Sequence, residues 1–282
     1  MALSRLRYSK TLPRIMISPK LIDVEFKWDG LQANPTEQEM LGAGAKSFPD
    51  SMRIPRSEWK DRINEHEKNY SSADFYSGRF TAQQNSHECV AHAAHQAFMI
   101  ARNRQLNGMK QDVWFSPLAL YTRITNGRRW GGSSVIDSMY EMIEHGMIPD
   151  HDGPDGQLSQ TNLFEHTLHE TSGRTESWWP TTGWVRPSEL PDGWENTARH
   201  FRALEVFTVP DREAHASCLL SGLCVVNGRN GHSIPHVKMV FDDGRYLSCY
   251  KDSYRVYRYD SERLWDSGGY VIRSTTIPEG AL

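Results

Sequence analysis

The spacing of apolar residues predicts four helices, three of them in the first half of the chain. From Cys89 onward, strong helix formers run without proline or glycine, and apolar side chains recur at helical spacing. Ser133 or Ser134 serves as the N-cap of the next amphipathic stretch, which a glycine ends. The predicted helices are Ser57–His66, Cys89–Arg102, Ser134–Gly146 and Asp211–Gly222.

Beyond residue 222 the apolar period shortens to that of β-strands. The pair Asp243-Gly244 is typical of a hairpin turn between two such strands. The strand-like runs are Leu223–Val226, Val237–Phe241, Tyr246–Tyr250 and Val271–Ile272. Helices therefore come first and strands later, with no internal repeat. This order is typical of an α+β fold with a helical half and a sheet-rich half.

Two further segments indicate how the chain is divided. Residues 1–20 carry five basic side chains and no acidic one, as in a transit peptide, an arm that docks onto a partner, or a solvated tail. We predict an N-terminal basic extension over residues 1–50 and a single domain over residues 51–282. Within that domain, residues 150–200 hold four tryptophans, and we interpret them as an ordered insertion.

Composition and charge narrow the classes of protein that the chain fits. Its 282 residues are 38% hydrophobic, which is enough to bury a sizeable core. The 32 basic and 35 acidic side chains give no net positive charge, which argues against a general nucleic-acid-binding protein. No run approaches the ~20 apolar residues of a membrane span, and the N-terminus lacks the apolar core of a secretion signal. We expect a cytoplasmic location, or one inside a viral or phage particle, with no nucleic-acid or membrane partner.

The cysteines exclude two further classes of protein. Four scattered cysteines are too few for a disulfide scaffold, and no Cys-x-x-Cys pair supports a structural zinc site. His92 and His95 share a helix face with Cys89, but no clear fourth metal ligand accompanies them. We therefore predict free thiols, no metal and no cofactor. The four cysteines are Cys89, Cys218, Cys224 and Cys249.

Cys89 differs from the other cysteines because it stands where a coil meets the start of a predicted buried helix. The positive end of the helix dipole favours a thiolate there, and the thiolate is the nucleophilic form. The alternative is a small buried hydrophobic residue, which is the common role of a free cysteine.

The segment from Gln83 to Val90 resembles the papain-like cysteine peptidases. In that family a Gln six residues before the nucleophilic Cys donates to the oxyanion, and the Cys opens the central helix. A tetrahedral intermediate needs such preorganised donors, here the amide of Gln83 and the backbone N–H of Cys89. The sequence departs from plant and lysosomal members at Glu88 and Val90, where they have a small residue and Trp. An acid beside the thiol is adverse to catalytic efficiency.

Further motifs match this family in its order along the chain. Gly131 and Gly132 resemble glycines whose backbone pairs with an extended substrate, an approach that a side chain would block. The resemblance spans roughly residues 80–275. It implies a two-lobed fold, with the Cys helix in a helical left lobe and an antiparallel β-barrel-like right lobe, in a divergent branch of phage or prokaryotic type. The other matches are Ser116-Pro117 with Tyr121, Gly231-His232-Ser233-Ile234, Lys251-Asp252-Ser253-Tyr254, and Trp265 through Tyr270.

The resemblance implies a Cys-His-Asp triad and leaves two histidines as the base. His232 stands in the Gly-His-small-aliphatic pattern. His236 lies sixteen residues before Asp252, the interval of papain itself, and a turn at Asp243-Gly244 pairs it better with Asp252. Even spacing gives both the same side of a strand, and we favour His232 with His236 as the alternative. Asp252 replaces the usual Asn, and a carboxylate orients an imidazolium in other triads. Tyr254 replaces a Trp and offers an aromatic shield for the His–Asp pair.

Three functions fit these residues. The first is a thiol hydrolase that cleaves peptide or isopeptide bonds of a polypeptide substrate. The second is a catalytically weak or inactive structural protein, such as a virion or particle subunit, whose N-terminal arm docks onto a larger assembly. The basic arm, the Trp-rich insertion, Glu88 and Asp252 favour this second function. The third is acyl transfer or deamidation by the same triad, which a product assay distinguishes.

Overall fold

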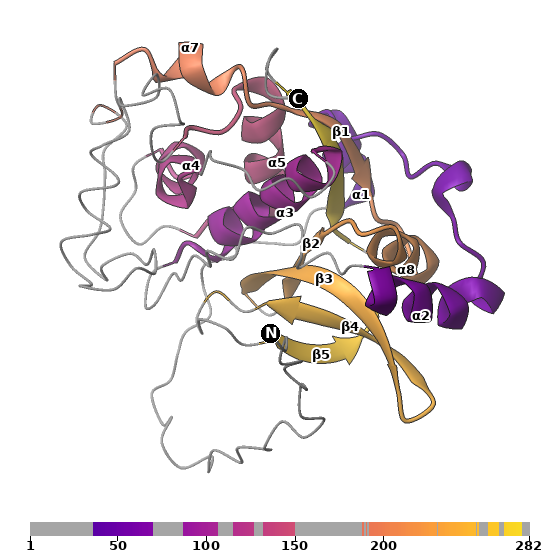
Figure 1. Ribbon diagram of the computed structural model, residues 1–282. Coiled ribbons are helices and arrows are strands. Elements are labelled where there is room, and N and C mark those ends of the chain that lie inside the picture. The colour runs from indigo at the N-terminus through magenta and orange to yellow at the C-terminus, as the bar shows by residue number, and fades with distance from the viewer. Residues whose placement is uncertain are drawn as a thin grey trace, which may run out of the picture.

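An antiparallel β-sheet organises the fold, with its strands in the order β1-β6-β2-β3-β4-β5 (Figure 1). The computed structural model describes residues 36–69, 87–106, 115–126, 132–149, 188, 190, 192–229, 231–251, 253, 259–264 and 268–277. Among the described strands β1 pairs only with β6, and β5 only with β4, so the sheet is open rather than a closed barrel. The strands are β1 (Ala203–Thr208), β2 (Val225–Arg229), β3 (His232–Asp242), β4 (Arg245–Lys251), β5 (Tyr259–Arg263) and β6 (Tyr270–Thr275).

Helices cover both faces of this sheet. One face packs against α3, which also contacts α4 and α5, and the other face packs against α8 and α2. None of the described helices has both the length and the apolar content to cross a membrane. The helices are α1 (Glu37–Gly42), α2 (Trp59–Asn69), α3 (Cys89–Gln105), α4 (Pro117–Ile124), α5 (Val135–Glu144), α7 (Trp194–Ala198) and α8 (Arg212–Leu220), with short 3-10 turns η2 (Asp50–Met52) and η3 (Arg56–Glu58). The mixed α+β class predicted from the sequence is therefore confirmed.

Alternation along the central strands separates two hydrophobic cores. Val226 of β2 packs in the cluster that contains α3, whereas its neighbour Val225 packs in the cluster that contains α8. The same division separates Ile272 from Val271 in β6. Because successive side chains of a strand point to opposite faces, the sheet forms the partition between the two cores.

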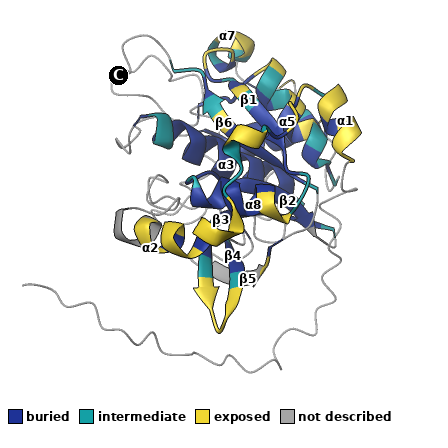
Figure 2. Ribbon diagram, turned by 90° about the vertical axis from the view of Figure 1, so that its right-hand side faces the viewer, coloured by how far each residue is buried: buried dark blue, intermediate teal, exposed yellow. Residues whose placement is uncertain are grey.

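The α3 helix is buried on all sides. Every residue from Cys89 to Asn103 is buried, and Figure 2 shows the helix in the buried colour between the sheet and the neighbouring helices. Five alanines lie in this stretch, and their small side chains let the surrounding elements approach closely. The predicted helix over Cys89–Arg102 is confirmed, and the structure extends it to Gln105.

The predicted caps and turns are also found. Ser134, rather than Ser133, is the N-cap of α5, and its side chain accepts a hydrogen bond from the backbone N–H of Asp137. Asp243 and Gly244 have φ of 46° and 73°, the two positive values that a tight hairpin turn with the strand twist requires. Strands β1 and β5 were not predicted from the sequence.

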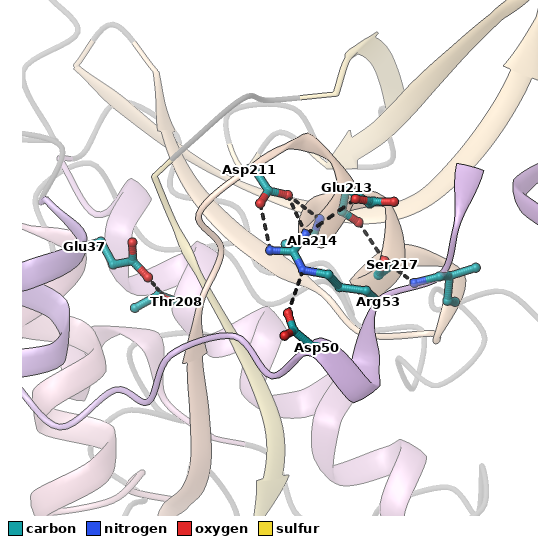
Figure 3. Close-up of polar contacts among 9 residues, drawn as sticks. Glu37, Asp50, Arg53, Thr208, Asp211, Glu213, Ala214 and Ser217 are labelled. Atoms are coloured by element: carbon teal, nitrogen blue, oxygen red, sulfur yellow. Dashed lines mark hydrogen bonds and ion pairs between the residues drawn. The ribbon is translucent and has the colours of Figure 1, made fainter. Parts of the chain in front are cut away.

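The segment that precedes α3 packs both against strand β1 and against the core beside α3. Lys46 forms an isolated parallel bridge with Phe207 of β1, and Thr208 donates to the carboxylate of Glu37 at 2.8 Å (Figure 3). Met40 of α1 is buried in the core beside α3. Residues 36–50, inside the range predicted as an N-terminal extension, therefore pack against the sheet and its core.

Arg53 joins the segment before α2 to the start of α8. Its guanidinium donates to both carboxylate oxygens of Asp211, at 3.0 and 2.8 Å, and lies near Asp50 and Glu213 (Figure 3). Asp211 is also the N-cap of α8, accepting from the backbone N–H of Ala214. These hydrogen bonds, chiefly the one from Arg53, lower the pKa of Asp211.

We expect Asp211→Ala to lower the free energy of unfolding by about 1–2 kcal/mol, because it removes a helix cap and a bidentate partner. Because the folded-state pKa of Asp211 is lowered, its contribution is present above about pH 4 and is lost as pH falls below it. Urea unfolding at pH 7 and pH 3 measures this difference. An equal cost of the substitution at both pH values would contradict the assignment.

Candidate active site

Cys89 is the first residue of α3, and its side chain is only 1% exposed. It packs in the core cluster that also holds Cys224, Val237 and Tyr270 from the adjoining face of the sheet. The thiol therefore lies at the positive end of a 17-residue helix, as the sequence predicted. Burial is the largest cause of the raised pKa of the Cys218 and Cys224 thiols, and a raised pKa is typical of an inert structural cysteine.

His232 is the first residue of β3, the strand on which α3 packs. It follows Gly231, whose φ of 78° turns the chain into the strand, and its side chain is buried at 7% exposure. It pairs with Arg229 of β2 across the ladder. Because β3 and β4 are antiparallel, the first residues of β3 and the last residues of β4 lie at the same end of the sheet.

His236 occupies a different environment, beneath α8. Its Nδ1 lies 2.9 Å from the hydroxyl of Ser248, and its ring meets those of His215 and Tyr250 at centroid distances of 4.8 and 5.9 Å. The next residue, Val237, packs in the core on the α3 side, so the side chain of His236 points to the opposite face. These contacts make His236 a core histidine between the sheet and α8.

The two histidines share a side of the pleat but not a position along it. The β2–β3 ladder is regular from Val225↔His236 to Arg229↔His232, as the even spacing predicted. Four residues place His232 about 13 Å farther along the strand, past the contacts that enclose His236. Strand twist also rotates the pleat over that length. By alternation His232 therefore starts from the same side of the pleat as His236, at the end of the strand and beyond the contacts that enclose His236.

Glu88 and His92 form a buried pair on either side of Cys89. The carboxylate Oε2 of Glu88 lies 3.5 Å from Nε2 of His92, and both side chains are 1% exposed. The spacing of four residues places the two on one face at the start of the helix. Sequence analysis predicted Glu88 as an acid beside a thiol and found no metal site at His92. The i,i+4 spacing of the two residues is the sequence signal for this pair.

Several other predicted site residues lie outside the described residues. These are Gln83, Gly131, Asp252 and Tyr254. Gly132 is described and half-buried, two residues before the N-cap of α5. Among the described residues, no group of three or more His, Cys, Asp or Glu side chains is arranged to hold a metal ion.

The glycine before β6, in the match that runs from Trp265 through Tyr270, has a structural explanation. Gly269 has φ of 144°, and a Cβ there would come within 2.6 Å of the backbone oxygen of Val226. Tyr270 then begins β6, fully buried, with its hydroxyl 3.1 Å from that of Ser138 in α5. This motif joins the sheet to the helical half of the fold, and only glycine permits the close approach of β6 to β2.

Comparison with known proteins identifies the architecture. No protein-family model and no curated protein matches the sequence. Among solved structures, procathepsin B S9 from Trypanosoma congolense matches with a TM-score of 0.53 at 8% identity, over 89% of each chain. Xylellain, a cysteine protease from Xylella fastidiosa, matches with a TM-score of 0.49 at 13% identity, over 70% of this chain and 82% of its own. The Amb a 11 cysteine protease from ragweed pollen, in its proform, matches with a TM-score of 0.48 at 13% identity, over 88% and 73%.

The similarity to procathepsin B S9 covers nearly the whole of both chains, so this protein has the papain-like α+β fold. At such low identity the similarity establishes the fold alone.

Proposed function

We propose that this protein, which has the papain-like fold, is a thiol hydrolase that cleaves peptide or isopeptide bonds. The observation that carries the proposal is the position of Cys89, the first residue of a helix buried against the sheet whose strand β3 begins at His232. A nucleophile at a helix N-terminus and a histidine on the adjoining strand are the two groups that covalent acyl transfer requires.

In this mechanism His232 accepts the thiol proton of Cys89, and the thiolate sulfur attacks the carbonyl carbon of the substrate. The amide of Gln83 and the backbone N–H of Cys89 stabilise the oxyanion. His232 then protonates the leaving amine, and a thioester with Cys89 remains. A water molecule, deprotonated by His232, hydrolyses that thioester and restores the thiol.

Asp252 has the role of orienting the imidazole and stabilising its protonated form. Its sequence neighbour Lys251 ends β4, which pairs with the His236–Asp242 part of β3. The register pairs Tyr250 with His236, so the end of β4 lies four residues along β3 from His232. The proposal therefore needs the chain after Lys251 to continue toward the start of β3. Gly131 and Gly132 are the proposed backbone partners of an extended polypeptide substrate, and Tyr254 the proposed shield of the His–Asp pair.

One observation favours a second candidate, a catalytically weak protein that uses the fold for assembly, as in a particle subunit. The carboxylate of Glu88 is buried one residue from Cys89, in a medium that screens charge poorly. A negative charge there opposes formation of the thiolate, and a protonated His92, whose Nε2 lies 3.5 Å from that carboxylate, would offset it. In this alternative the partner is a larger assembly, onto which the N-terminal arm docks, rather than a polypeptide substrate.

Thiol labelling distinguishes the two candidates. We expect iodoacetamide at neutral pH to modify Cys89 at least about tenfold faster than the other three cysteines. All four are buried, but Cys89 is the one at a helix N-terminus, which favours the reactive thiolate. Mass spectrometry of tryptic peptides over time measures each rate, with Cys89→Ser as the control. Labelling of Cys89 no faster than that of Cys249, together with co-purification of a large assembly, would favour the structural role.

A further inference from the structure

We draw no further inference here: the strongest candidate, a surface of exposed apolar side chains on the neighbouring elements α1, α5 and β1 (Leu41, Tyr140 and Leu204), carries no proposal because nothing in the part of the chain that the structure describes shows what covers it.

Discussion

Replacement of Cys89 by alanine is expected to abolish peptide hydrolysis, with a fall in kcat/KM of at least about a thousandfold. The thiol sulfur forms the bond to the substrate carbonyl, and alanine offers no nucleophile in its place. The substitution removes one buried atom from a helix start, so we expect a change in unfolding free energy of no more than about 1 kcal/mol. Hydrolysis of a mixed peptide library, followed by mass spectrometry, measures the activity.

Cys224→Ala is the matched control for this experiment. Cys224 is a buried cysteine in the same hydrophobic cluster as Cys89, and burial raises the pKa of its thiol. Its replacement makes a cavity of the same size without removing the proposed nucleophile, so activity is expected to persist. Unchanged hydrolysis in Cys89→Ala would refute the mechanism, and equal loss in both variants would show that the effect is structural.

The second large effect is a division between the two histidines. We expect His232→Ala to reduce kcat at least about a thousandfold with little loss of stability, because the proposed base is removed. We expect His236→Ala to keep substantial activity but to lower the unfolding free energy by about 2 kcal/mol or more. Its ring is enclosed by Ser248, His215 and Tyr250, and alanine leaves these groups facing a cavity.

Measurement of kcat and of urea unfolding for both variants shows which histidine is the base and which one stabilises the core. The reverse outcome, in which His236→Ala loses activity without loss of stability, would make His236 the base. The pH dependence of kcat provides an independent readout. The acidic limb of the profile, where the imidazole of the base becomes protonated, is expected to persist in His236→Ala and to be absent from the residual activity of His232→Ala.

Much of the secondary structure could be predicted from local signals. The N-caps Ser134 and Asp211, the glycine stop at Gly146 and the Asp243-Gly244 turn depend on side chains within four residues of one another. Strand β1 was missed because Ala203–Thr208 lacks a clear alternation and is buried on both faces toward its end. Its strand conformation depends on pairing with β6, about seventy residues later in the chain.

The candidate site could be predicted only in part. The start of α3 at Cys89 follows from helix formers and spacing, and the structure confirms it. The contacts of His236 could not be predicted, since they depend on His215 from a helix that packs on the strand from another part of the chain. The burial of Glu88 also depends on the elements around α3, although its i,i+4 relation to His92 is visible in the sequence.

The sequence thus specifies features that arise within a few residues or along one periodic element: the helices and their caps, the hairpin turn, and a cysteine at a helix N-terminus. The tertiary structure decides which face of the sheet each element covers. It therefore decides that Cys89 packs on the α3 side and that His236 lies beneath α8. The physical reason is that alternation assigns side chains to two faces, whereas only packing determines what lies over each face.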